Sequence, residues 1–464
     1  MSFDFARLSA LEITAGVRGR NFTAVAVADA LLARIESLNP RLNAYTHVAA
    51  IRALREAAQV DRAIAEGRDP GPLAGAPYSV KNLFDLEGVV TLAGSKINRE
   101  NPPAAEDATA VARLRAAGAV CLGATNMGEY AYDFVTVNAH DGPTRNPHDL
   151  TRSAGGSSGG SGASVAGGLC AFSLGTDTNG SVRVPASFCG VWGLKPTYGR
   201  LSRAGVFPFA GSLDTVGVLG RSVADLARAF DAMSGADSRD VVCSSATSAP
   251  VEPELEQGLD GLRLGLLGGY FETGASPEAA GAVEAIAGAL ARVERLELPC
   301  PQLARSAAYV ITAAEGGELH RERLARRAHD YDPAARDRFI AGALTPAAWY
   351  LHAQRFRACW KAQMAEVFAR FDVLVAPATP IAAPGLEQQT FDFNGQQLPV
   401  RANIGVYTQP ITLIGLPVVA APVHAPGRLP IAVQLIGRPG GESQLLRAAR
   451  ALERAGVCAA PVVD

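Results

Sequence analysis

A tract rich in glycine and serine, residues 153–168, interrupts an otherwise apolar part of the chain. Such a composition is also typical of flexible linkers. Here an apolar run over 169–174 follows at once, and residues 222–234 predict a capped amphipathic helix beyond it. The tract therefore lies inside a folded domain, where its glycines make a tight backbone bend sterically possible.

Amphipathic helices and short apolar strands alternate on both sides of this tract. The spacing predicts helices over 22–38, with Asn21 or Thr23 as the N-cap and Asn39-Pro40 as the end, and over 49–65 and 107–117. Alternation of this kind is typical of a parallel or mixed sheet between layers of helices. Strands are predicted over 76–81, 120–124, 373–376, 418–421 and 431–436, and a last helix over 442–455.

The 464 residues correspond to about three average domains or to one unusually large α/β domain. We predict one domain over 1–464 in four segments, because both halves supply strands. These are N-terminal helices (1–65), a core that carries the motifs below (about 66–237), a helix-rich insertion (about 257–371) and a part that completes the sheet (372–464). A flexible connection is expected over 238–256.

Composition excludes several classes of function. The formal net charge of −2 offers no basic footprint for nucleic acid. The seven cysteines are dispersed, and the sequence has neither a phosphate-binding loop nor an HExxH motif, so we expect no metal and no cofactor. The N-terminus does not have the pattern of a secretory signal, and no apolar stretch is long enough to span a membrane, so we expect a cytoplasmic protein without a membrane partner.

Two familiar hydrolase patterns receive little support. Residues 156–160 satisfy GxSxG, but the apolar strand that precedes the nucleophile in α/β-hydrolases is absent, since Asn146-Pro147-His148-Asp149 lies there. The seven histidines are scattered along the chain and do not suggest a histidine-based triad.

Three segments together give a more specific signal. Lys81 ends a predicted strand, Ser157 lies within the run 155–161, and Ser181 lies within 175–185, 24 positions after Ser157. In these motifs the chain resembles the amidase signature family, and the resemblance continues through ASFCGVWGLKPTYGR at 186–200 and covers most of the chain. It implies one large α/β/α sandwich around a mixed, twisted sheet.

The resemblance also implies a catalytic mechanism. Ser181 would be the nucleophile, Ser157 a proton relay after a cis Gly156–Ser157 bond, and Lys81 the base. Lysine has an ordinary pKa near 10.4, so it can act as a base near neutral pH only if burial lowers that pKa. An oxyanion hole would be formed by the backbone N–H groups of Thr178, Asn179, Gly180 and Ser181, although many relatives have glycine in place of Asn179.

Two charged residues beside the nucleophile have a different expected role. We predict that Arg183 and Asp177 brace the active-site loop and do not touch substrate.

Within the family, the sequence is most similar to amidases that hydrolyse 1-carboxybiuret in cyanuric acid breakdown. That substrate is small and anionic, so its pocket should supply a cation and hydrogen-bond donors, for which Tyr132, Arg145 and Arg401 are candidates. The resemblance further implies a small helical partner subunit, bound at an exposed apolar groove, and a homodimer of large subunits.

Three other functions remain open from the sequence. The chain could be the glutaminase subunit of a tRNA-dependent amidotransferase, another small-amide amidase, or an inactive scaffold subunit. The presence of Lys81, Ser157 and Ser181 together argues against the scaffold.

Overall fold

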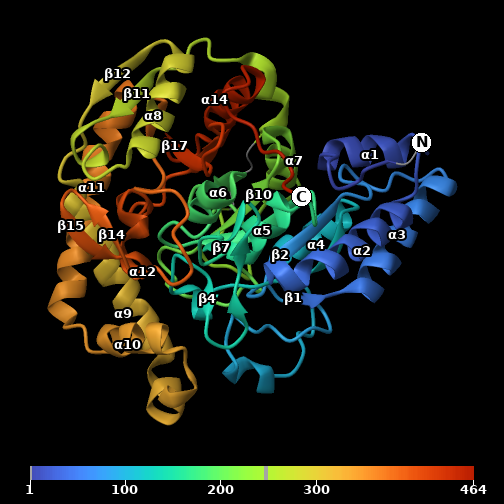
Figure 1. Cartoon of the computed structure of the whole chain (residues 1–464), viewed down its shortest axis with the longest axis horizontal. Helices are drawn as coiled ribbons and strands as arrows, with labels where there is room; N and C mark the ends of the chain where they lie inside the picture. The colour runs from blue at the N-terminus through green and yellow to red at the C-terminus, as the bar shows by residue number, and fades with distance from the viewer. Residues whose placement is uncertain (1–2, 245–248) are drawn as a thin grey trace.

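The computed structural model describes residues 3–244 and 249–464, and in these a mixed sheet of eleven strands runs through the molecule (Figure 1). This confirms the predicted α/β fold. In spatial order the strands are β1 (Tyr45–Val48), β3 (Val120–Thr125), β2 (Pro77–Lys81), β8 (Phe172–Asp177), β10 (Thr215–Gly220), β9 (Trp192–Lys195), β16 (Val418–Val423), β17 (Ile431–Gly437), β13 (Val373–Pro377), β11 (Leu264–Leu267) and β12 (Val293–Leu296).

Helices cover the sheet and extend beyond it. Figure 1 shows α1, α2 and α3 at one end of the molecule and α9, α10 and α11 at the other. The long helices are α1 (Ala10–Arg18), α2 (Ala24–Leu42), α3 (Ala50–Ala65), α4 (Thr109–Ala116), α5 (Gly159–Ala166), α6 (Arg183–Cys189), α7 (Val223–Met233), α8 (Pro277–Leu290), α9 (Pro301–Arg327), α10 (Pro333–Ala343), α11 (Ala347–Arg370) and α14 (Glu442–Arg454).

Besides several short 3-10 helices, the described structure contains further short elements. They are the helices α12 (Val400–Asn403) and α13 (Gln409–Thr412) and the paired strands β4 (Val137–Asn138) with β5 (Gly142–Pro143), β6 (Arg145–Asn146) with β7 (Asp149–Ser153), and β14 (Thr390–Phe393) with β15 (Gln396–Pro399). Every helix in residues 3–244 and 249–464 is too short or too polar to cross a membrane.

One predicted boundary is wrong. Helix α2 begins after Thr23 as one alternative predicted, but it continues through Pro40 to Leu42. Proline cannot donate to the carbonyl of Glu36, yet both residues are exposed, so water can bind that carbonyl and the helix is not broken. The apolar run 169–174 begins as the turn out of α5, and strand β8 starts only at Phe172.

The segment 257–371 contains more than helices. Its strands β11 and β12 extend the sheet at one edge, in parallel with β13. Each has only four residues, which is too short for a periodic pattern to be visible in the sequence. Part of the expected flexible connection, residues 245–248, lies outside the described residues.

The order of the central strands determines where the functional motifs meet. Strand β2 pairs in parallel with β3 on one side and with β8 on the other, with Val80 opposite Leu174. Every residue of these three strands is buried, as expected for a sheet covered on both faces. Because β2 and β8 are parallel, their carboxyl ends bring Lys81 and Asp177 to the same edge.

Candidate active site

Lys81 lies at the carboxyl end of β2 and is completely buried. Its Nζ donates hydrogen bonds to Ser157 Oγ at 2.8 Å and to Thr176 Oγ1 at 3.0 Å. Burial lowers the pKa of the Lys81 amine to about 7, although the nearby charge of Asp133 acts in the opposite direction. A substantial fraction of this amine is therefore uncharged at neutral pH.

The glycine-rich tract brings Ser157 to this amine. The Gly156–Ser157 peptide bond is cis, as the family resemblance implied. A Cβ atom at Gly156 would lie 2.4 Å from the backbone nitrogen of Val135, and one at Gly160 would lie 2.4 Å from the carbonyl oxygen of Ala44. Side chains at these positions would prevent the close packing of the backbone, which explains why the tract needs glycine.

The loop between β8 and α6 carries Ser181 and is held by a buried ion pair. The Arg183 guanidinium donates to both carboxylate oxygens of Asp177, at 2.8 and 2.9 Å, and also to Gln434 in β17 at 2.7 Å. Burial raises the pKa of Asp177, but the charge and hydrogen bonds of Arg183, together with other nearby donors, outweigh it and hold that pKa below its usual range. The predicted bracing role of Arg183 and Asp177 is confirmed.

The backbone N–H groups of this loop are not equivalent. Gly180 N–H donates to Asp177 Oδ1 at 2.7 Å, so this donor is already used inside the protein, contrary to the predicted oxyanion hole. Across the part of the chain that the structure describes, no protein acceptor faces the N–H groups of Thr178, Asn179 and Ser181. Three of the four predicted donors are thus available to a ligand.

Ser181 borders a narrow cavity, which we call the Ser181 cavity. Four residues of its lining each carry a buried polar atom that has no hydrogen-bond partner among the described residues. These atoms combine donors with acceptors, and they are Tyr132 Oη, Asp133 Oδ1, Asn179 Oδ1 and Arg338 Nε. Since buried polar atoms are almost always paired, four of them around one cavity indicate a site for a polar ligand.

Arg338 in α10 is the cation of this cavity. Its Nη1 donates to the carbonyl oxygen of Tyr132 at 2.6 Å, and its guanidinium lies 3.7 Å from the centre of the Tyr132 ring. Sequence reasoning missed this residue, because it lies 157 positions after Ser181 in a segment with other arginines such as Arg336. Neither its spacing nor its neighbours in the sequence distinguish it.

Two of the three predicted substrate-binding residues, Arg145 and Arg401, do not line the Ser181 cavity themselves. Arg145 donates to the carbonyl oxygen of Leu150 at 2.8 Å, inside the hairpin of β6 and β7. Arg401 donates to the carbonyl oxygen of Val137 at 3.1 Å and borders a different cavity. Its guanidinium also lies 3.9 Å from Oδ2 of Asp133, a lining residue of the Ser181 cavity. Of the three candidates, Tyr132 lines the Ser181 cavity. Proximity in sequence to the motifs was therefore a poor guide to which residues line it.

Comparison with known proteins places this geometry in context. The family model described as Amidase matches residues 26–446. The chain is 51% identical to the AtzE subunit of 1-carboxybiuret hydrolase from Pseudomonas sp. strain ADP, over 97% of this chain and 99% of the relative. It is 37% identical to a subunit of the glutamyl-tRNA(Gln) amidotransferase from Carboxydothermus hydrogenoformans, over 96% of this chain and 97% of the relative.

Solved structures agree with these sequence matches. One of them has an inhibitor bound and comes from a vestigial protein complex that bears on the origins of an s-triazine catabolic enzyme. It matches with a TM-score of 0.96 and 50% identity, over 97% of this chain and 99% of that one. The corresponding glutamyl-tRNA(Gln) amidotransferase protein of Thermotoga maritima matches with a TM-score of 0.82 and 29% identity, over 100% of this chain and 99% of that one.

Proposed function

The chain belongs to the amidase family and hydrolyses amides, and on that premise we propose that its substrate is 1-carboxybiuret, with Ser181 as the nucleophile. The main support for this choice of substrate is the set of unpaired polar atoms on residues that line the Ser181 cavity. The 51% identical relative is named for hydrolysis of this compound, and that similarity supports the same choice.

The chemistry of a carboxylated ureide matches these atoms. Arg338 Nε can donate to the substrate carboxylate, and charge-assisted bonds of this kind are the strongest in proteins. Asn179 Oδ1 and Asp133 Oδ1 are acceptors that can bind the N–H groups of the ureide. A primary aliphatic amide carries both of its N–H groups on one nitrogen, whereas a ureide carries N–H groups on several nitrogens and can pair with acceptors that lie apart. An acceptor left unpaired in the buried site costs affinity.

In the proposed acylation step, a chain of proton transfers activates Ser181. Its hydroxyl proton passes to Ser157, whose own proton passes to the neutral amine of Lys81, 2.8 Å away. Ser181 Oγ then bonds to the amide carbon, and the carbonyl oxygen becomes negatively charged. The free N–H groups of Thr178, Asn179 and Ser181 are placed to stabilise that charge, and each such donor is typically worth about 3–4 kcal/mol.

Collapse of this intermediate breaks the carbon–nitrogen bond. The leaving nitrogen takes the proton back from Lys81 through Ser157, and ammonia departs when the terminal amide is cleaved. Water then attacks the acyl-enzyme, its proton follows the same path to Lys81, and the Ser181 hydroxyl is restored as the acid is released. The lysine ends the cycle uncharged, as it began.

The test is ammonia release from 1-carboxybiuret, allophanate, malonamate and glutamine, measured with the wild type and with Ser181→Ala. We expect 1-carboxybiuret to have the highest kcat/KM, and Ser181→Ala to lower turnover of every amide by about 10⁴-fold or more with an unchanged melting temperature. A preference for glutamine that depends on a transferase partner would instead favour the amidotransferase function, as the 37% identical relative suggests.

A second measurement tests the role of Arg338. We expect Arg338→Gln to lower kcat/KM for 1-carboxybiuret by about 10- to 100-fold, mainly through KM, because one charge-assisted bond is lost. Arg336→Gln, two residues away on the same helix, is the matched control. Equal effects of both variants would contradict direct binding of the substrate by Arg338.

We also propose that the chain works as a homodimer of large subunits, together with a small helical partner. The support is that one similar structure comes from a protein complex and that the relatives include subunits of larger enzymes. Light scattering on the protein purified from its native source tests this proposal, which a single free chain would contradict.

A further inference from the structure

Phe209 lies where three cavities meet. The Ser181 cavity is the smallest of the three. Phe209 also lines a cavity of about 220 Å³ that contacts Thr176 and Val206, which we call the Thr176 cavity. It lines as well a groove of about 630 Å³ along Glu315 and Leu319, the Glu315 groove.

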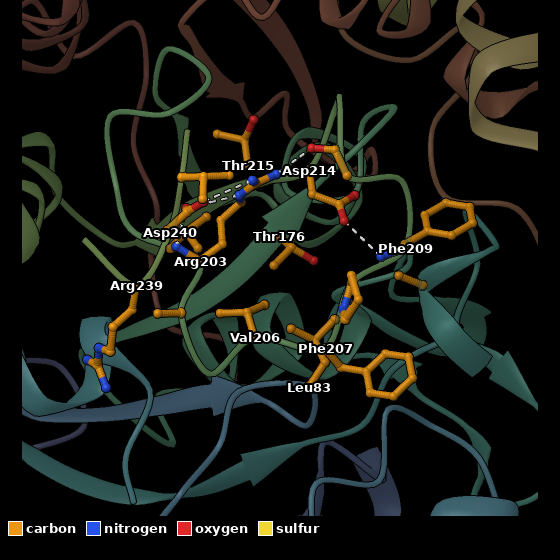
Figure 2. Close-up of a pocket in the computed structure, with 16 residues that line it drawn as sticks. Leu83, Thr176, Arg203, Val206, Phe207, Phe209, Asp214, Thr215, Arg239 and Asp240 are labelled. Atoms are coloured by element: carbon orange, nitrogen blue, oxygen red, sulfur yellow. Dashed lines mark hydrogen bonds and ion pairs between the residues drawn. The ribbon is translucent and has the colours of Figure 1, made fainter. Parts of the chain in front are cut away.

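Figure 2 shows the Thr176 cavity, with Phe209 and Phe207 at one edge. Both phenylalanines line this cavity, but only Phe209 also lines the Ser181 cavity and the Glu315 groove. The two residues come from the same loop, two positions apart. They are therefore a natural test pair, one at the boundary of the Ser181 cavity and one outside it.

The structure holds Phe209 firmly. Its backbone N–H donates to Asp214 Oδ2 at 2.7 Å, and the other oxygen of that carboxylate accepts from the Thr178 hydroxyl at 2.6 Å. The loop of Phe209 is thereby tied to the loop of the nucleophile. The Phe209 ring lies 4.7 Å from that of Tyr132, and a Cβ atom at Gly316 in α9 would come within 3.0 Å of it.

We infer that Phe209 is the specificity-determining residue that restricts this enzyme to short amides. Its ring fills the space through which the Ser181 cavity would otherwise join the Thr176 cavity and the Glu315 groove. A substrate that extends beyond the ureide core needs that space. The lining beyond the ring is largely apolar, with Val206 and Leu319, so truncation of Phe209 should admit substrates with a longer hydrocarbon spacer.

This inference rests on the proposed amidase site, and it is tested with the monoamides of the dicarboxylic acids from three to six carbons. These compounds keep one carboxylate and one amide and differ only in the spacer. For the wild type we expect kcat/KM to fall by roughly tenfold or more for each added methylene. For Phe209→Ala we expect the kcat/KM of the longest compound, divided by that of the shortest, to be at least about tenfold higher than in the wild type.

Binding gives the same comparison without turnover. Calorimetric affinities of the four monoamides are measured for Ser181→Ala and for Ser181→Ala combined with Phe209→Ala. If wild type turns over no amide, the proposed function fails, while the binding profile still decides the role of Phe209. A length profile that is unchanged by Phe209→Ala in both assays overturns the inference.

Two further variants separate specificity from folding. Phe207→Ala should leave the length profile as in the wild type, because Phe207 does not line the Ser181 cavity. Phe209→Leu keeps an apolar side chain of intermediate size, so it provides a folded variant if Phe209→Ala does not fold. It should shift the length profile in the same direction as Phe209→Ala, but by less. A shift of equal size in Phe207→Ala, or none in a folded Phe209→Leu, contradicts the inference.

Discussion

Two completely buried lysines end strands of the same sheet, Lys81 in β2 and Lys195 in β9. Burial lowers the pKa of each amine to about 7. They differ in their partners, because Lys81 Nζ contacts the hydroxyls of Ser157 and Thr176, whereas Lys195 Nζ donates to the carbonyl oxygen of Pro196 at 2.9 Å. Burial is the main cause of the lowered pKa in both, so the pKa alone does not distinguish the two amines, and we expect the nearby hydroxyls to make Lys81 the base.

The largest expected effect in this comparison is that of Lys81→Met. The wild-type kcat/KM should rise with pH through about 7 and then level off, because the proposed base is the uncharged amine. In Lys81→Met we expect a loss of about 10³-fold or more and no inflection near pH 7. An inflection that persists in this variant would assign it to another group.

A smaller effect is expected from Thr176→Val, which removes one of the two hydroxyls that accept a hydrogen bond from Lys81. An acceptor favours the charged amine, so its loss should lower the pKa further and move the inflection to lower pH. We expect kcat/KM at the plateau to fall by about tenfold, since the amine is held less precisely. Thr215→Val, in the adjacent strand β10, is the control and should leave the inflection in place.

The smallest effect on activity is expected from Lys195→Met, with kcat/KM within about threefold of the wild type. Its effect is on stability instead. In the unfolded chain a lysine binds its proton below pH about 10.4, but in the folded protein only below about 7, so unfolding takes up one proton per buried lysine between these values. The free energy of unfolding therefore rises with pH in this window, by about 1.4 kcal/mol per pH unit for each lysine.

Lys195→Met should reduce the slope of the free energy of unfolding against pH by about 1.4 kcal/mol per pH unit. The slope is measured by urea unfolding at pH 7.5 to 9.5. Lys81→Met should reduce it equally, although only Lys81→Met abolishes activity. If Lys195→Met lost the pH dependence of activity instead, the distinction between the two lysines would be wrong.

The parts of the site that the sequence predicted share one property. Lys81, Ser157 and Ser181 each lie in a short, locally unusual stretch, the end of a buried strand or a glycine-rich motif, so their chemistry is visible in adjacent residues. The strands that hold them are likewise apolar enough to recognise, and the structure confirms the mixed sheet that they predict.

The remaining parts depend on contacts between distant segments. Arg338 reaches the cavity only because α10 is packed on α9, and nothing near it in sequence indicates this. The N–H group of Gly180 is lost as a ligand donor because the Asp177 carboxylate turns back toward its own loop. Arg401 borders another cavity and approaches this one through its ion pair with Asp133, and neither charge nor sequence position reveals such an arrangement.

The Arg183 clamp has a consequence for how the protein is made. Its guanidinium bonds Asp177 beside the nucleophile and also Thr408, Thr412 and Gln434, residues that the ribosome adds more than two hundred positions later. Until those partners emerge, a buried cation beside the nucleophile has only part of its hydrogen bonding satisfied. A nascent or truncated chain should therefore carry the motif without the activity.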